Sequence, residues 1–470
     1  MPLELLYNVP IPGQILMQVF VAVAMVYMLY RHRRDALSVL LILLCCPRVF
    51  LFFGSTMGNV YKVVMLLLCG YVFVQQRAAV AYQRKEGWIL LLFALFSVEF
   101  FWTAAYYTQN TLTIIFSQYS RYVEAVLLYF IIKKAIIIDG KGDRLLRLLY
   151  EIGLMQIIIS VFKFAVFREQ VESLCASFSI YGGDMGTTIP ILWFIVLWLY
   201  RKGQFSKLDW LYLLGLLFVG FSSGKRAVMF ILPIVVFVFF VYVQGRKVGK
   251  YALYVLAFVP LLFYLGVRLT PTLNPENQVW GSFDWDYAFG YAEEYQFGKK
   301  GIEGQTANFK TEQLQYSGGV ISTYNSKLEA DGRGGATIAM FKLLLGMHPT
   351  ADSDWWGLGF NSMYSTDYAE FDKLPLTIQL NHKGSATGFF QSYVTIGLAG
   401  AICTVLFCFC FWFYIKNRRL RWTIMGICAW EYFMYTGSIF RTPVFMAVLF
   451  VVMHYSNMEI QQKRRAQLRR

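Results

Sequence analysis

Charge is scarce in this chain of 470 residues. Only 15% of its residues are Asp, Glu, Lys or Arg, whereas 57% are hydrophobic and the mean hydropathy is +0.49. Because soluble domains carry about 25% charged residues, this composition excludes an ordinary soluble fold. Apolar runs of about 20 residues recur along the sequence, and each can cross a bilayer core of about 30 Å. The sequence therefore predicts an all-α polytopic membrane protein.

Cysteine and histidine are also few, and their positions argue against two kinds of site. Seven of the eight cysteines lie in apolar segments and only Cys175 falls in a predicted extracytoplasmic loop, so we expect no disulfide framework. The four histidines show no metal-binding spacing, so we expect no metal and no other cofactor. No basic stretch precedes the first apolar segment, which we expect to remain as an anchor.

The net charge of +15 is concentrated in short basic clusters between the apolar runs. This distribution follows the positive-inside rule and gives no indication of nucleic-acid binding. The clusters follow alternate runs, which places the N-terminus outside the cell and the C-terminus in the cytoplasm. They lie at 31–34, 84–87, 133–134, 201–202, 245–250, 416–421 and 463–470.

We predict 13 spans, within a range of about 12 to 14. Residues 1–268 hold ten of them, 269–387 form a large extracytoplasmic loop, and 388–470 hold the last three spans and a basic tail. A twelve-span arrangement with a re-entrant first segment is the alternative. The predicted spans are 11–30, 36–54, 59–76, 87–107, 111–132, 145–166, 186–200, 208–222, 226–244, 251–268, 388–415, 422–437 and 439–455.

The outward stretch 269–385 is acidic, with 8 Lys or Arg against 14 Asp or Glu. Loops of this length are usually functional. Its first half is rich in Tyr, Trp, Gly and carboxylates, a mixture that suits a sugar-contacting surface. A solvated loop with aromatic residues at the membrane interface is the alternative. In its second half, 332–348 reads as a helix that begins at Arg333 and ends before Pro349.

Charged residues inside predicted spans are the first functional candidates, because such charges are costly in lipid. Arg121 and Glu124 stand at i, i+3 on one span, which favours a structural ion pair. Arg48 and Arg441 either tie helices together or bind anionic headgroups. Glu99, Glu431 and Arg226 complete the set.

The segment SSGKRA at 222–227 indicates an anion site. Lys225 and Arg226 begin an inward-running span beside Ser223 and Gly224, and a helix N-terminus offers unpaired N–H groups and the positive end of the dipole. The alternative is a pair of cations that snorkel to ordinary headgroups. Arg333 is a second outward arginine at a helix start. Two guanidinium groups could clamp a pyrophosphate.

His348 and His382 are the two outward histidines. A neutral histidine suits a general base that acts on a sugar hydroxyl. His382 lies in NHKGSATG at 381–388, shortly before a span that carries GLAG at 397–400.

The order of these motifs resembles the O-antigen polymerase and O-antigen ligase superfamily, the Wzy and WaaL types. The similarity covers about residues 205–415 and includes DGRGGATIAM at 331–340 and GLGF at 357–360. It implies a GT-C-like fold in the bacterial inner membrane, with a periplasmic active site. It also implies an undecaprenyl-pyrophosphate-linked oligosaccharide donor and inversion without a metal. Membrane lipids and a chain-length regulator are the other expected partners.

The resemblance also implies roles for single residues. Arg226, with Lys225 and Ser223, and Arg333 would hold the pyrophosphate, and His382 would be the base. The sequence departs from the family pattern here, because His382 precedes Gly397 by fifteen residues rather than about ten. The alternatives for the base are Ser385, Thr387 or a loop carboxylate.

Three functions are consistent with these features. The long outward loop and the histidine register favour a polymerase, which adds the growing glycan to another lipid-linked repeat unit. A ligase would add it to lipid A–core. A lipid-linked oligosaccharide flippase or other transporter belongs to a different class, and it is disfavoured because we find neither internal repeats nor a midplane site.

The basic clusters generate a topology prediction. Residues 269–385 should be extracytoplasmic and the tail at 463–470 cytoplasmic. A membrane-impermeant thiol reagent should therefore label Ser282→Cys in intact cells and leave Gln467→Cys unlabelled until the membrane is opened. The reverse pattern would invert the topology and remove the outward site.

Overall fold

The computed structural model describes residues 11–106, 112–167, 176–178, 184–222, 234–235, 237–239, 260–261, 263–270, 273–276, 278–288, 387–434, 440 and 442–468. Within these ranges the regular structure is helical and contains no strand. Six helices there are long and apolar enough to cross a membrane, which confirms a helical membrane protein. The total of 13 spans and the GT-C-like fold stay predictions.

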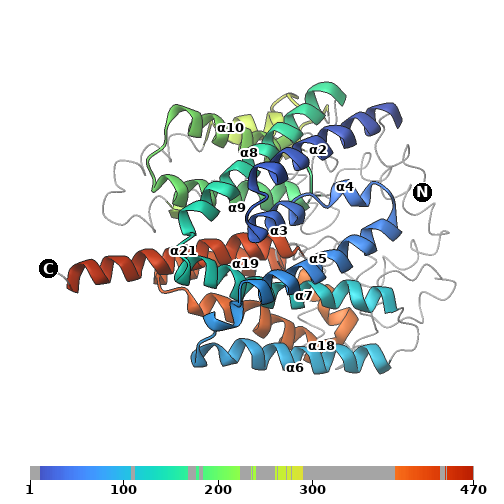
Figure 1. The fold of residues 1–470 in the computed structure, drawn as a ribbon. Helices are drawn as coiled ribbons and strands as arrows, with labels where there is room; N and C mark the ends of the chain where they lie inside the picture. The colour runs from blue at the N-terminus through green and yellow to red at the C-terminus, as the bar shows by residue number, and fades with distance from the viewer. Residues whose placement is uncertain are drawn as a thin grey trace.

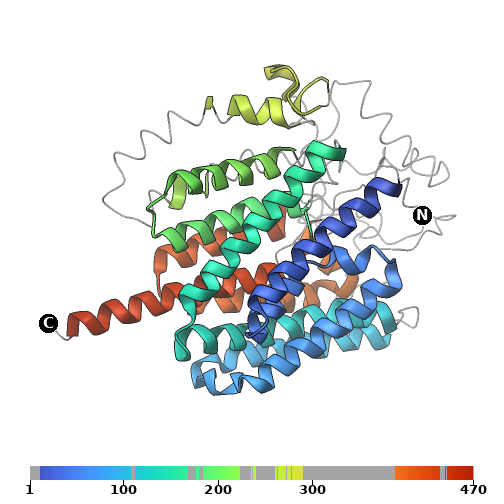
Figure 2. The same cartoon turned by 45° about the horizontal axis from the view of Figure 1, so that its top comes forward.

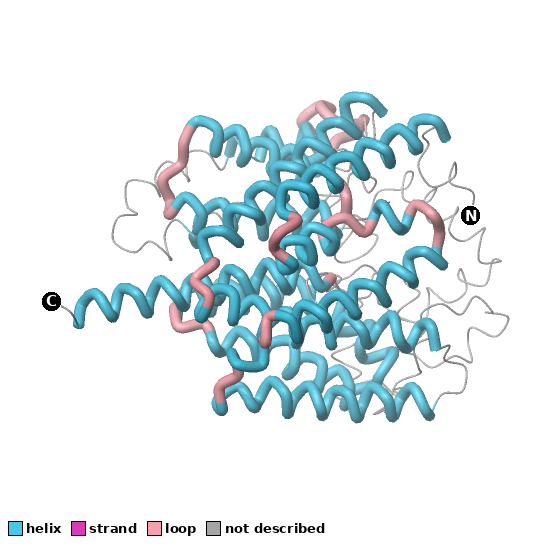
Figure 3. Tube along the Cα trace, in the orientation of Figure 1, coloured by secondary structure: helices cyan, strands magenta, loops and turns pink. Residues whose placement is uncertain are grey.

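The helices form a bundle whose members lie side by side and are joined by short loops at the basic clusters (Figures 1 and 3). Helix α2 begins on the right in Figure 1, and α21 ends beyond the opposite side of the bundle. The principal helices are α2 (Ile11–His32), α3 (Ala36–Leu44), α4 (Arg48–Leu51), α5 (Ser55–Gln75), α6 (Gly87–Tyr106), α7 (Leu112–Lys133), α8 (Gly142–Phe167), α9 (Asp184–Arg201), α10 (Lys207–Ser222), α18 (Gly388–Cys410), α19 (Arg418–Met434) and α21 (Pro443–Leu468).

Helix α21 is the central element of the bundle. Its residues from Val444 to Asn457 are buried on every side, because it packs against α7, α8, α9 and α3. A helix that is apolar all round is stable only when it is surrounded in this way. The other helices pack in neighbouring pairs, notably α5 with α7, α6 with α18, and α9 with α10 (Figure 2).

Several of the basic clusters that the structure describes, those around Lys85, Lys133, Lys416 and Arg464, meet at one end of the bundle. At the end of α2, Arg31 and His32 contact Glu151 of α8 at 3.1 and 3.0 Å. In the turn that follows α2, Asp35 Oδ2 lies 3.7 Å from Arg144 Nη2 of α8. Burial, followed by the like charges of Lys85, Arg464 and Lys133, lowers the pKa of Lys416. Clusters that are far apart in the sequence therefore share one surface, as the positive-inside pattern requires.

A buried ion pair fixes the turn between α5 and α6 near the basic end. Lys133 Nζ lies 2.5 Å from Glu86 Oε1 and donates to the Ala81 carbonyl at 2.6 Å. The Tyr129 hydroxyl donates to the same carboxylate at 3.0 Å, and its ring packs against His454 of α21. The charge of each partner is therefore met inside the protein rather than in lipid.

Helices α8, α9 and α10 contact one another at Gly153. The Trp193 indole N–H of α9 donates to the Leu149 carbonyl of α8 at 2.7 Å. A Cβ atom at position 153 would lie 1.9 Å from Tyr212 Oη and 2.1 Å from Trp193 Cδ1. Only glycine permits this contact, because both neighbours are buried aromatic side chains.

This packing predicts the effect of Gly153→Ala. The added methyl group should displace both aromatic rings and lower the melting temperature of the detergent-solubilised protein, because overpacking costs about 1–3 kcal/mol. Gly70→Ala on α5 is the matched control, since no atom lies within 4 Å of its added Cβ. An unchanged melting temperature for Gly153→Ala would contradict the packing of these three helices.

Candidate functional site

Among the sequence-predicted candidates, the structure places Arg48 in α4, Glu99 in α6, Arg121 and Glu124 in α7, and Glu431 in α19. Thr387, an alternative for the base, is buried and caps α18, where its side chain accepts from the Phe390 N–H at 3.2 Å. Arg48 is buried and Arg121 is half-buried. The remaining predicted site residues lie outside the described residues. They are Ser223, Lys225, Arg226, Arg333, His348, His382 and Arg441.

The predicted span 36–54 is not one helix. The chain forms α3, leaves helical structure around Cys45 to Pro47, and resumes as the single turn α4. Proline has no N–H group, so Pro47 cannot continue the hydrogen-bond pattern of α3. The carbonyl that it would have used, that of Leu43, accepts from the Tyr61 hydroxyl of α5 at 3.0 Å instead.

Ser177 satisfies the other backbone groups at this break. The Arg48 N–H donates to the Ser177 carbonyl at 3.1 Å. The Ser177 hydroxyl lies 2.6 Å from the Cys45 carbonyl and 2.7 Å from Gln156 Oε1, and its single proton serves one of them at a time. The Ser177 N–H donates to the same Gln156 oxygen at 3.0 Å. The break is therefore closed by a segment more than 120 residues away.

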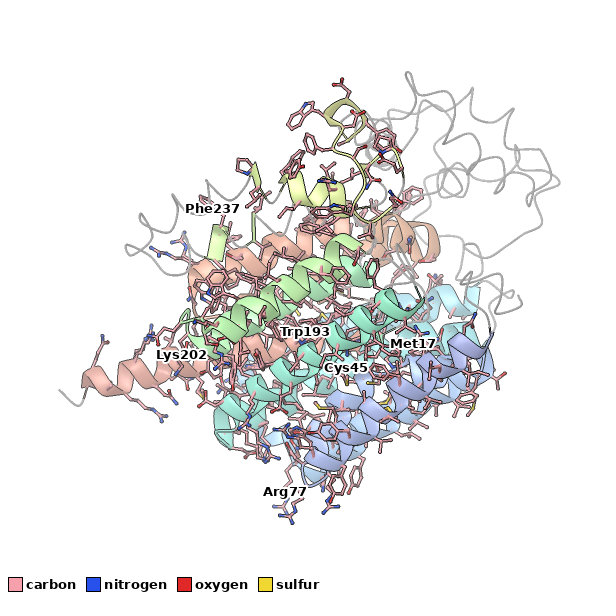
Figure 4. The ribbon with its side chains drawn as sticks, turned by 90° about the horizontal axis from the view of Figure 1, so that it is seen from above. Met17, Cys45, Arg77, Trp193, Lys202 and Phe237 are labelled. Carbon is pink, nitrogen blue, oxygen red and sulfur yellow. The ribbon has the colours of Figure 1, made fainter. Side chains whose placement is uncertain are left out.

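The break lies deep in the bundle. Asp35, just before α3, pairs with Lys141 and Arg144 at the basic end. The nine residues of α3 rise about 1.5 Å each, so Cys45 lies about 14 Å from that end. This depth is close to the middle of a hydrocarbon core of about 30 Å. Figure 4 shows Cys45 inside the bundle, between Trp193 of α9 and Met17 of α2.

Arg48 begins α4 and is among the largest fully buried side chains, with 2% exposure. Its Nε and Nη1 atoms have no hydrogen-bond partner. Gln18 of α2 donates from Nε2 to the Val49 carbonyl at 2.9 Å, which places a second polar side chain beside α4. On α8, Gln156 and Ser160 are both fully buried one turn apart.

A second group of charges lies between α5 and α7. Glu124 is 4% exposed and lies on α7 with Arg121, while Lys62 is on the neighbouring helix α5. The Arg121 guanidinium donates from Nη2 to the Ser117 carbonyl at 3.5 Å. The predicted side-chain ion pair between Arg121 and Glu124 is not among the salt bridges of the described residues.

The Gly-Leu-Ala-Gly element at 397–400 coincides with a kink in α18. Gly397 has φ 71° and ψ −175°, a conformation that is essentially restricted to glycine. Before the kink, Ser392 and Tyr432 of α19 share a hydrogen bond of 2.8 Å. The kink redirects the helix that follows the outward loop, at the motif by which the sequence resembles the polymerase and ligase superfamily.

Part of the stretch that the sequence predicts to be an outward loop is described, and Asn274 forms its central hydrogen bonds. Its side-chain amide donates to the carbonyls of Thr270 at 3.0 Å and Gln278 at 2.8 Å. Hydrogen bonds from Ser282, whose N–H donates at 2.8 Å, lower the pKa of the exposed Glu276 carboxyl. The guanidinium group of Arg268 lies over the ring of Trp280, with its Cζ atom 4.4 Å from the ring centroid.

This segment presents aromatic rings and carboxylates together. Trp280 and Trp285 are 52% and 55% exposed. Asp284 and Asp286 are also exposed in the same turn. The segment (yellow in Figure 2) lies beyond α10 at the edge of the bundle.

Sequence reasoning missed Gln18, Gln156, Ser160 and Ser177. The first three are polar residues within apolar runs, and the Cys-Cys-Pro-Arg sequence at 45–48 is the local signal of a helix break. Their convergence depends on contacts between α2, α4, α8 and the turn at 176–178, and local periodicity cannot show it.

The kink generates a prediction for Gly397→Ala. A side chain at φ 71° is strained by about 1–3 kcal/mol, so the variant should melt at a lower temperature than the wild type. Gly426→Ala on α19 is the control, because its Cβ would meet no atom within 4 Å. Equal melting temperatures for Gly397→Ala and wild type would mean that α18 is straight at this point.

The comparisons with known proteins add no relative. No protein-family model matches the chain, and no curated protein matches it significantly. The resemblance to O-antigen polymerases and ligases therefore depends on the short motifs alone.

Proposed function

We propose that the chain is a membrane glycosyltransferase, of the polymerase type, that uses a lipid-pyrophosphate-linked glycan. The observation that supports it best is the ordered turn at 273–288, where exposed Trp280 and Trp285 stand beside Asp284 and Asp286. Aromatic faces and carboxylates both bind polyols. Because the hydrogen bonds of Asn274 already fix this turn, its aromatic rings and carboxylates would contact a sugar without a further loss of backbone freedom.

The reaction would transfer the glycan from the pyrophosphate carrier to a hydroxyl of another lipid-linked repeat. Negative charge develops on the leaving pyrophosphate, and Arg226 and Arg333 would stabilise it, with Lys225 and Ser223 beside Arg226. Removal of one such donor typically costs about 3–4 kcal/mol. His382 would accept the acceptor proton, a contribution of about 10²–10⁴-fold. The lipid donor itself supplies the leaving group, so no nucleotide takes part.

A ligase would use the same donor chemistry and differ only in its acceptor, lipid A–core. The second candidate function is a lipid-linked oligosaccharide flippase, and one observation favours it. Transporters place binding sites near the bilayer midplane at interrupted helices, and the break between α3 and α4 lies at that depth with Arg48 beside it. The sequence alone disfavoured this function because it showed no midplane site.

Purified protein in lipid vesicles should convert lipid-linked repeat units into a ladder of longer products. We expect Arg226→Ala and Arg333→Ala each to abolish the ladder without loss of folded protein, because each removes a cation from the leaving group. Lysine at either position should restore only part of the activity, since an ammonium group cannot bind two oxygens as a guanidinium fork does. Gel analysis of the products measures both effects.

The same assay separates the candidates for the base. His382→Ala should lower turnover with little effect on donor binding, and the wild-type rate should fall below a pH of about 6.5 as the histidine is protonated. Normal turnover would transfer the role to Ser385, Thr387 or a carboxylate. Normal ladders from Arg333→Ala would exclude the pyrophosphate clamp. Movement of the lipid across the membrane without elongation would identify a flippase instead.

A further inference from the structure

The Arg48 guanidinium is a buried charge that no described carboxylate meets. None of the salt bridges among the described residues includes Arg48. Its Nε and Nη1 atoms lack any hydrogen-bond partner, although the residue is 2% exposed. Arginine cannot lose its proton in a protein, so the charge persists at this depth. An unpaired buried charge is strongly unfavourable, and such residues in membrane spans mark ion or substrate sites.

Further unpaired donors lie on the neighbouring helix. Gln156 Nε2 and Ser160 Oγ of α8 are both buried without a partner. Gln156 is linked to the start of α4 through Ser177, whose N–H donates to Gln156 Oε1 and whose carbonyl accepts from the Arg48 N–H. The backbone at the start of α4 and the Gln156 side chain of α8 are therefore connected by two consecutive hydrogen bonds through Ser177, and Ser160 lies one turn further along α8. On the α2 side of α4, Gln18 Oε1 is an unpaired acceptor.

We propose that Arg48, Gln156 and Ser160 form an oxyanion site that binds a phosphoryl group inside the bundle. Four donor atoms are without partners: Arg48 Nε and Nη1, Gln156 Nε2 and Ser160 Oγ. A carboxylate offers two oxygens, whereas a terminal phosphoryl group offers three and matches a guanidinium fork equally well. Gln18 Oε1 can accept a hydrogen bond from a ligand hydroxyl or a protonated phosphoryl oxygen.

This site is separate from the pyrophosphate clamp of the proposed function, because it shares no residue with Arg226 or Arg333. The phosphoryl group could belong to a polyprenyl phosphate, to a membrane phospholipid or to free phosphate. These sources share the chemistry that Arg48 recognises. They differ in what else is attached to the phosphorus, so separate probes can distinguish them.

The test measures binding to the purified full-length protein in detergent, with no glycan acceptor present. The probes are inorganic phosphate, farnesyl phosphate and dioctanoyl phosphatidylglycerol. We expect saturable binding of at least one probe to the wild type, and a Kd at least tenfold weaker for Arg48→Gln. Arg48→Lys should fall between them. Arg34→Gln, an exposed arginine at the basic end, is the control and should bind as the wild type does.

The pattern among probes identifies the source. Binding of inorganic phosphate indicates a site for the free anion, whereas binding of farnesyl phosphate alone indicates a polyprenyl carrier. Binding of phosphatidylglycerol alone indicates a structural phospholipid. Ser160→Ala keeps the charge and removes one donor, so it should weaken the same probe by about two- to tenfold. It also carries the test if Arg48→Gln does not fold.

A readout without ligand separates a binding role from a structural one. If Arg48 binds an external anion, its charge has no partner in the ligand-free protein. Arg48→Gln then removes an unfavourable buried charge, so the ligand-free variant should melt at the same temperature as the wild type or at a higher one. A lower melting temperature together with unchanged probe affinity would make Arg48 a structural tie and overturn the site. Absence of binding of all three probes to the wild type would overturn it as well. Failure of the ladder assay would leave these results unaffected.

Discussion

Hydrocarbon offers no hydrogen bonds, and this constraint governs the structure most strongly where α3 ends. A helix that stops inside a bilayer leaves backbone carbonyl and N–H groups that must find partners within the protein. Three of the groups at the break around Pro47 have such partners. The Leu43 carbonyl accepts a hydrogen bond from the Tyr61 hydroxyl, and the Cys45 carbonyl lies within hydrogen-bond distance of the Ser177 hydroxyl. The Arg48 N–H donates to the Ser177 carbonyl. The break is thus a built feature that holds α5, α8 and the turn at 176–178 in register.

The same constraint explains the basic end. Lys133 and Glu86 are both almost fully buried, and each lies within hydrogen-bond distance of its partner and of a further polar group. Desolvation of two charges is unfavourable, and close geometry with additional hydrogen bonds offsets it. Because Tyr129 extends the contact to His454, the pair also couples the α5–α6 turn to the central helix α21.

The sequence predicted the helices well where apolar length and basic clusters define them. The predicted span 208–222 is α10 (Lys207–Ser222), and 186–200 is α9 (Asp184–Arg201). Helix α21 continues to Leu468, beyond the predicted 455, because apolar length marks the membrane and not the end of the helix. The break in 36–54 was missed, since a proline in an apolar run also fits a kinked helix. Its partner Ser177 is 132 residues from Cys45, a distance that no local pattern spans.

Arg48 and Lys133 differ in a way that bears on function. Both are buried cations in the same bundle, but Lys133 Nζ donates to a carboxylate and a carbonyl, while the Nε and Nη1 atoms of Arg48 have no hydrogen-bond partner. Ser177, which closes the broken backbone, also links the start of α4 to Gln156 of α8, and no salt bridge among the described residues includes Arg48. Neutral donors around a fixed positive charge leave a net charge for an external anion to neutralise. A structural tie would have been completed by an acid, as Glu86 completes Lys133. The α3–α4 break thus holds the backbone in place and leaves one buried charge unmatched by the described residues, and this imbalance is what the proposed phosphoryl site would neutralise.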